Sequence, residues 1–182
     1  IQYGTSMCYP VSSMGSHVSV VPNHQLNRKT PLHTRANVAY FGTFGYELDL
    51  NKLSDEEISE VKQQITFMKE YRELIQFGTF YRLKSPFEGN ETAWMTVSED
   101  KKTALVFWYR ERNVVNADFT RVRLQGLDPD LIYRNEYNGT ENYGDELMNL
   151  GLLTTDCTAG EPTSEDEPCT DYESRIYVLT AK

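Results

Sequence analysis

The sequence predicts an α/β segment followed by an all-β domain. Strand and helix patterns alternate from residue 1 to about residue 84, and hydrophobic residues then recur with a period of two. The length of 182 residues is enough to bury one large core or two modest ones. Alternating strands and helices favour a parallel sheet, as in a parallel barrel, although two such units alone cannot close one.

The first predicted strand lies within "SSMGSHVSVVPNHQ", residues 12–25, where small or polar residues alternate with apolar ones. We expect Val18 and Val20 to share a face that packs under helices. The opposite face, which points into the lumen in a barrel, then carries Gly15, His17 and Ser19. The pattern stops at Pro22, Asn23 and His24.

A helix and a second strand follow. Thr30 is the expected N-cap, Pro31 suits the first helical position, and the helix is predicted to run to Gly42. The stretch "TFGYELDL", residues 43–50, is the second predicted strand.

The clearest local signal is a long helix beginning at Ser54. Ser54 and Glu57 have the spacing of a capping box, and Leu53 and Ile58 that of a hydrophobic staple. Gly78 is the expected stop. The predicted buried face consists of Ile58, Val61, Ile65, Met68 and Leu74.

The rest of the chain predicts a small antiparallel β-sandwich, because short segments rich in aromatic and β-branched residues alternate with polar turns. The predicted strands span residues 79–84, 92–98, 103–110, 118–124, 131–137, 143–148 and 174–182. The acidic stretch at 154–170 is predicted to be a mobile loop.

Composition excludes several classes of partner. The formal net charge of −9 argues against nucleic-acid binding, which needs clustered Lys and Arg. No window approaches the roughly 20 apolar residues of a membrane span, and the first residues lack the pattern of a signal peptide. We therefore expect no nucleic-acid or membrane partner and a cytoplasmic location.

Cysteine and histidine spacing does not indicate a metal or cofactor site. The three cysteines are Cys8, Cys157 and Cys169, and the three histidines are His17, His24 and His33. Neither set has metal-ligand spacing, so we expect no metal and no cofactor. Free thiols are favoured, while a Cys157–Cys169 disulfide stays open for an oxidising setting.

Two groups of residues invite a chemical interpretation. Glu47 and Asp49 lie two apart, so on a strand they share a face, and two carboxylates are what glycoside hydrolysis needs. Acidic residues at a strand end also solvate loops and cap helices. Trp108 and Tyr109 fall on opposite strand faces, where stacking on a sugar competes with core packing by one of them.

Four long stretches resemble a known family. They are "YGTSMCYPVSSMGSHVSVVPNHQ", "TPLHTRANVAYFGTFGYELDL", "YRELIQFGTFYRL" and "YGDELMNLGL". In this order they are similar to the C-terminal part of microbial α-galactosidases of glycoside hydrolase family 36. The main departure is the acidic insert around Cys157 and Cys169.

The resemblance implies a retaining hydrolase that releases terminal α-linked galactose from melibiose and raffinose-type oligosaccharides. The family has a central (β/α)8 barrel, the TIM barrel, followed by a C-terminal antiparallel β domain. Residues 1–84 would then hold the last two β/α units of the catalytic barrel, and residues 85–182 the C-terminal β-sandwich. By this analogy the chain is a C-terminal fragment of an enzyme whose relatives are often homo-oligomers.

The resemblance also implies that the catalytic pair lies elsewhere. The family's nucleophile and acid/base Asp occur in Lys-Trp-Asp-Xaa-Asn and Ser-Asp-Asp-Thr-Asp stretches, and neither stretch occurs here. We expect both upstream of Ile1, so the fragment alone is predicted to be inactive, and Glu47 and Asp49 do not match the pair. Residues predicted to lie at the rim of the substrate pocket, or just behind it, are Ser16, His17, Asn23 and His24.

A second hypothesis assigns the chain to a different class. In it, the β domain is a non-catalytic carbohydrate-binding or interaction module, and the first 84 residues are a helical dock. The binding residues would then be Trp94, Trp108 and Tyr109.

Overall fold

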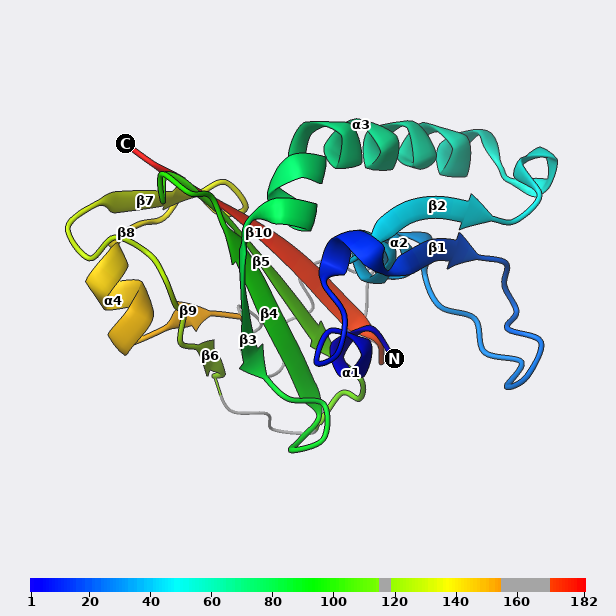
Figure 1. Ribbon diagram of the computed structural model, residues 1–182. Coiled ribbons are helices and arrows are strands. Elements are labelled where there is room, and N and C mark those ends of the chain that lie inside the picture. The colour runs from blue at the N-terminus through cyan, green and yellow to red at the C-terminus, as the bar shows by residue number, and fades with distance from the viewer. Residues whose placement is uncertain (115–118, 155–170) are drawn as a thin grey trace. The chain divides into compact units, whose positions relative to one another are not determined.

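The computed structural model describes residues 1–114, 119–154 and 171–182 (Figure 1). The chain divides into two compact units, Ile1–Phe77 and Gly78–Lys182. The division falls seven residues before the predicted boundary at residue 84, because Thr79–Lys84 forms a strand of the second unit's sheet. The predicted loop at 154–170, with Cys157 and Cys169, lies almost entirely outside the described residues.

The first unit is built on one β-α-β motif followed by a long helix. Its elements are α1 (Gln2–Thr5), η1 (Val11–Ser13), β1 (Gly15–Ser19), α2 (Leu32–Ala39), β2 (Thr43–Glu47), η2 (Leu50–Lys52) and α3 (Asp55–Phe77). β1 and β2 are parallel, with Gly15 opposite Thr43 and Ser19 opposite Glu47. A parallel pair needs a crossover connection, which α2 provides.

Burial alternates along β1 as predicted, but the strand is shorter. Val18 is buried, while Gly15, His17 and Ser19 are exposed on the opposite face. The prediction that Val20 shares the buried face is wrong, since pairing with β2 ends at Ser19 and Val20 is exposed beyond the sheet.

The start of α2 differs from the prediction by one residue. Pro31 is the N-cap, no side chain caps the helix, and the helix ends at Ala39 rather than near Gly42. Thr30 contributes its carbonyl instead, which accepts a hydrogen bond from Nε of Arg35 at 3.0 Å. The same Arg35 donates through Nη1 to the carbonyl of Ser19 at 2.6 Å, so it ties α2 to the carboxyl end of β1.

The predicted capping box of α3 is confirmed. The backbone N–H of Ser54 donates to Oε2 of Glu57 at 2.9 Å, and the N–H of Glu57 donates to Oγ of Ser54 at 3.2 Å. The buried residues of the helix are Val61, Gln64, Met68 and Ile75. Two of these were not predicted, and Gln64 is polar.

The second unit contains one large antiparallel sheet in the strand order β3-β4-β5-β10-β7-β8. Its strands are β3 (Thr79–Lys84), β4 (Glu91–Val97), β5 (Thr103–Arg110), β7 (Ile132–Asn135), β8 (Glu141–Tyr143) and β10 (Glu173–Ala181). β10 is last in sequence yet lies inside the sheet, between β5 and β7. The predicted antiparallel β architecture is therefore present.

A second, thinner layer packs on this sheet. It contains the short pair β6 (Arg121–Val122) and β9 (Leu152–Leu153) and the helix α4 (Gly144–Asn149). Their apolar side chains join those of the sheet in one core, which includes Met95, Val106, Trp108, Leu124, Tyr133, Leu147 and Tyr177. This layering fits the predicted sandwich.

Two strand predictions in this unit need correction. In the stretch at 143–148, Tyr143 ends strand β8 and the remaining residues belong to α4. Asp145 and Glu146 occupy the first turn of this helix and suit its positive end. Of residues 119–124, the described part of the predicted strand at 118–124, only Arg121–Val122 forms a strand. None of the helices in the described ranges is long and apolar enough to cross a membrane.

Candidate functional site

The exposed face of the β1–β2 sheet is the strongest candidate for a functional surface. Helix α2 packs on β1, whose buried residues Ser16 and Val18 share one face, while alternation places His17 on the other. The opposite, exposed face carries Gly15, His17 and Ser19 from β1, and Thr43, Gly45 and Glu47 from β2. Sites in parallel α/β folds gather at the carboxyl ends of the strands, which here are Ser19 and Glu47.

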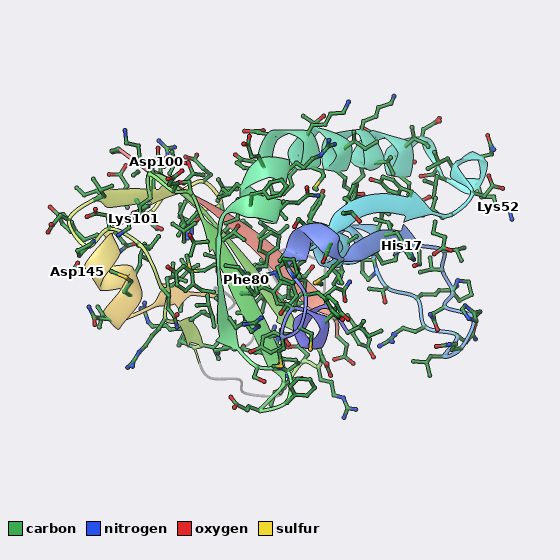
Figure 2. All side chains as sticks on the ribbon, viewed as in Figure 1. His17, Lys52, Phe80, Asp100, Lys101 and Asp145 are labelled. Carbon is green, nitrogen blue, oxygen red and sulfur yellow. The ribbon has the colours of Figure 1, made fainter. Side chains whose placement is uncertain are left out.

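His17 and Glu47 form an ion pair on this face. Nε2 of His17 lies 2.5 Å from Oε2 of Glu47, and the two side chains are 49% and 72% exposed. Figure 2 shows His17 on β1 within the first unit. An exposed pair of this kind adds little to stability. We therefore consider it for its position near the carboxyl ends of β1 and β2.

Asn23 and His24 follow β1 in an exposed turn. Oδ1 of Asn23 accepts hydrogen bonds from the backbone N–H groups of Gln25 and Leu26, both at 3.0 Å. Its own N–H donates to the carbonyl of Arg28 at 2.8 Å, closing the turn. Asn23 thus shapes the loop beyond the carboxyl end of β1, and His24 is exposed on that loop.

Ser16 points to the other face. It is buried, and its Oγ accepts a hydrogen bond from Nε2 of Gln2 at 3.3 Å. The four predicted rim residues therefore divide into one buried hydroxyl, one exposed imidazole and two loop side chains. A hollow of about 530 Å³ beside β1 is lined by both Ser16 and His17, together with Gln2, Tyr9 and Ser13 from the preceding segment.

The suggested pairing of Glu47 with Asp49 does not occur. β2 ends at Glu47, and Asp49 caps η2, where its Oδ1 accepts from the backbone N–H of Asn51 at 3.1 Å. The two carboxylates therefore do not share a strand face. The partner of Glu47 is His17, which sequence spacing did not indicate because the two residues come from different strands.

The helix-covered face of β2 has a structural role. The hydroxyl of Tyr46 donates to Oε1 of Gln64 on α3 at 2.8 Å, which explains why this polar residue is buried. Burial, followed by the negative charge of Glu60, raises the pKa of Tyr46 to about 12. Phe44 stacks on Tyr40 with ring centroids 4.9 Å apart, and burial also raises the pKa of Tyr40.

The two tryptophans suggested for sugar binding in the second unit are buried and not available to a ligand. Trp108 is fully buried in the core, and the guanidinium of Arg110 lies 5.4 Å from its ring centroid. Trp94 is 4% exposed and packs on Tyr109 with ring centroids 4.8 Å apart. As expected, Trp108 and Tyr109 lie on opposite strand faces, and Trp108 is the one that packs in the core.

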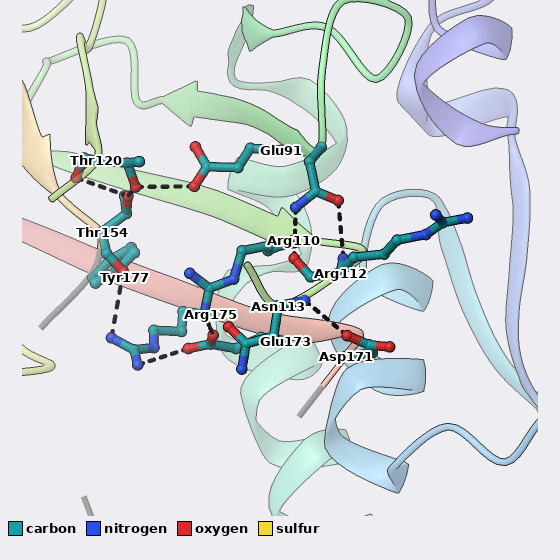
Figure 3. Close-up of polar contacts among 11 residues, drawn as sticks. Glu91, Arg110, Arg112, Asn113, Thr120, Thr154, Asp171, Glu173, Arg175 and Tyr177 are labelled. Carbon is teal, nitrogen blue, oxygen red and sulfur yellow. Dashed lines mark hydrogen bonds and ion pairs between the residues drawn. The ribbon is translucent and has the colours of Figure 1, made fainter. Parts of the chain in front are cut away.

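A polar cluster near β5 and β10 was not predicted from the sequence (Figure 3). Arg110 pairs with Glu173, and Nη2 of Arg175 lies 2.7 Å from Oε1 of the same Glu173. Nη1 of Arg175 and the hydroxyl of Tyr177 donate to the carbonyl of Thr154 at 3.5 and 3.3 Å. Glu173 pairs with both arginines, so we interpret the cluster as a structural link between β5, β10 and the end of β9.

Neither unit offers metal chemistry in its described part. Among residues 1–114, 119–154 and 171–182, no group of three His, Cys, Asp or Glu side chains could hold a metal ion. Cys8 is an exposed free thiol.

The two units match two consecutive family models. Residues 1–78 match the Melibiase model, and residues 91–179 match the model of the glycosyl hydrolase family 36 C-terminal domain. The boundary between the matches agrees with the division of the structure near residue 78. The fold and these matches define the chain as a region of a glycosyl hydrolase.

Similar proteins narrow the assignment. Alpha-galactosidase AgaA of Geobacillus stearothermophilus is 55% identical over 152 residues, which cover 84% of this chain and 21% of that protein. Alpha-galactosidase 1 of Pediococcus pentosaceus is 46% identical over 181 residues, covering 100% of this chain and 23% of that protein. The chain therefore spans about a fifth of the length of these relatives.

Solved structures agree. The α-galactosidase of Lactobacillus brevis matches with a TM-score of 0.91 at 43% identity, over 100% of this chain and 24% of that one. The GH36 α-galactosidase AgaA matches with a TM-score of 0.89 at 48% identity, again over 100% and 24%. The chain belongs to glycosyl hydrolase family 36.

Proposed function

We propose that this chain is part of a retaining α-galactosidase that hydrolyses terminal α-linked galactose from melibiose and raffinose-type oligosaccharides. The observation that carries the proposal is the parallel β1–α2–β2–α3 arrangement with a polar, exposed face at the carboxyl ends of its strands. The names of the relatives support the reaction. Structures of AgaA variants in complex with stachyose and with raffinose support the class of substrate.

In this proposal, β1 and β2 are the last two strands of a (β/α)8 barrel. Their sheet contains only these two strands in the described ranges, so each strand has an edge that no described strand pairs with. A groove along β2 is lined by Thr43, Tyr46 and residues of α3 such as Met68 and Arg72. A neighbouring strand and helix of a barrel would fill such a groove, and the exposed polar face would then line the lumen.

The second unit has a supporting role in this proposal. It would be the C-terminal β domain of the enzyme, as the model matched by residues 91–179 suggests. Trp108 packs in its core and Trp94 is buried, which argues against the carbohydrate-binding alternative built on Trp94, Trp108 and Tyr109. A homo-oligomeric enzyme and a cytoplasmic location remain predictions.

The chain does not contain the stretches that hold the two catalytic carboxylates in the family. We therefore propose that it is inactive by itself and that Ser16, His17, Asn23 and His24 contribute to the pocket from its rim or from behind it. Retaining hydrolysis needs a nucleophile and an acid/base, and this chain would support rather than supply them.

A chimera tests the proposal. The region of AgaA that this chain matches is replaced by this chain, and hydrolysis of 4-nitrophenyl α-galactoside is measured beside the isolated 182-residue chain. We expect activity in the chimera and none in the isolated chain, with 4-nitrophenyl β-galactoside as the substrate control. Hydrolysis by the isolated chain, or a folded chimera without activity, would contradict the proposal.

A further inference from the structure

We propose that His17 binds a hydroxyl group of the α-galactoside, and that Glu47 orients its imidazole for this contact. The inference rests on the proposed function, because the ligand enters only in the complete active site. It assigns a specificity role to a pair of residues from two neighbouring strands.

Register and spacing bring the pair to the exposed face. His17 lies opposite Gly45, and Glu47 lies two residues further toward the carboxyl end of β2. The pair therefore spans the two strands diagonally, as same-face neighbours on adjacent strands can. Its position near the carboxyl ends of parallel strands is where ligands bind in parallel α/β folds.

The surface around the imidazole is open. A Cβ atom added at Gly15 or at Gly45 would meet no atom within 4 Å. These two glycines flank His17, one on its own strand and one directly opposite. Glycine at both positions leaves space beside the ring for a ligand, and half of the His17 side chain is exposed.

The contact with Glu47 engages one of the two ring nitrogens. Because Nε2 of His17 pairs with the carboxylate of Glu47, Nδ1 is left for another partner. Within the described residues, no hydrogen bond reaches Nδ1 of His17. A neutral imidazole accepts at Nδ1 and a protonated one donates there, and a sugar hydroxyl can do either. The partner of one ring nitrogen of a histidine sets the role of the other nitrogen, so here Glu47 sets the role of Nδ1.

Glu47 also excludes the alternative ring orientation. A flip of the ring by about 180° would put Cε1 where Nε2 now lies, so the contact with Glu47 would be lost. Ser19 and Thr43 are the other side chains on this face, and both are short and uncharged. Glu47 is therefore the side chain on the exposed face of β1 and β2 that is charged and reaches His17.

The test uses the AgaA chimera and its His17→Ala and Glu47→Ala variants. Kinetics are measured with 4-nitrophenyl α-galactoside and with its analogues that each lack one ring hydroxyl group. We expect His17→Ala to lower kcat/KM about tenfold on the complete substrate, as the loss of one hydrogen bond predicts. On one analogue, which lacks the hydroxyl that His17 binds, this loss should disappear. Glu47→Ala should produce a smaller loss that disappears on the same analogue.

A matched control is His33→Ala, which removes an exposed histidine on α2 and should leave all rates unchanged. A His17→Ala chimera that loses the same factor on every substrate, or loses nothing, would overturn the inference. Should that variant fail to fold in a thermal melt, His17→Gln carries the same test. An inactive parent chimera would instead defeat the proposed function, so the two failures are distinguishable.

Discussion

Two strands of the molecule, β5 in the second unit and β1 in the first, bury their side chains in opposite ways. Along β5, the successive residues Ala104–Trp108 are all buried, so both faces of the strand are covered. Along β1, exposed and buried residues alternate strictly. Parallel strands are normally buried on both faces, whereas antiparallel ones commonly expose one, so each strand behaves in the manner usual for the other type.

The difference indicates that the exposed face of β1, and not a face of β5, is the candidate binding surface. β5 lies inside a six-stranded sheet and has a neighbouring strand on each side. β1 belongs to a two-stranded sheet, and its exposed face carries polar groups and glycines instead of apolar ones. A polar face of this kind on a parallel sheet is typical of a face that lines the lumen of a barrel, where ligands bind. It therefore supports the barrel proposal.

The largest expected effect on stability comes from truncating Trp108, which lies in the core of the second unit. Trp108→Ala should lower the free energy of unfolding of the second unit by about 3–5 kcal/mol, because a fully buried indole leaves a large cavity. Urea unfolding followed by the fluorescence of Trp94, the other tryptophan of the chain, measures it. Tyr143→Ala, at an exposed side chain, is the control and should cost less than about 0.5 kcal/mol. Similar costs for the two variants would show that the core is not closed around Trp108.

Two glycines sharpen the contrast between closed and open surfaces. An added Cβ at Gly144 would overlap the carbonyl oxygen of Asp128, whereas at Gly45 it meets nothing within 4 Å. We expect Gly144→Ala to cost about 2–3 kcal/mol and Gly45→Ala less than about 0.5 kcal/mol in this chain, as judged by urea unfolding with circular dichroism. Equal costs would contradict the open-face description. In the AgaA chimera, Gly45→Ala should nevertheless reduce activity if the face lines a pocket.

The smallest expected effect concerns the covered face of β2. The pKa of Tyr46 is raised to about 12 from 10.0, so folding favours its neutral form. The contribution to stability is therefore complete below about pH 10 and is lost as the pH rises toward 12. Tyr46→Phe should reduce this alkaline loss and cost about 1 kcal/mol at neutral pH through the hydrogen bond to Gln64. Unfolding measured across this range tests the slope, and an unchanged slope would indicate that Tyr46 titrates as in the unfolded chain.

Some elements could be predicted because their determinants are local. The capping box needs only Ser54 and Glu57, three residues apart, and the structure contains both of its hydrogen bonds. β5 was predicted at its observed bounds, since its β-branched and aromatic residues are continuous between polar turns. The helix α4 was missed because its short apolar pattern also fits a strand, and a six-residue helix carries little periodicity.

The candidate site was predicted only in part. His17 was expected on the lumenal face from alternation alone, and it lies on the exposed face of β1. Its partner Glu47 was instead paired with Asp49, because spacing along one strand is visible in a sequence and register between two strands is not. The roles of Ser16, Asn23 and His24 in a pocket stay predictions.

The sequence by itself determined the long capped helix, strand β5 and the family, because these depend on short-range spacing and on the residues themselves. Only the tertiary structure decided that His17 meets Glu47, that Asp49 caps a turn, and that Trp108 lies in the core. Each of these depends on residues brought together across strands or layers, where register and packing, rather than local preference, set the distance between side chains.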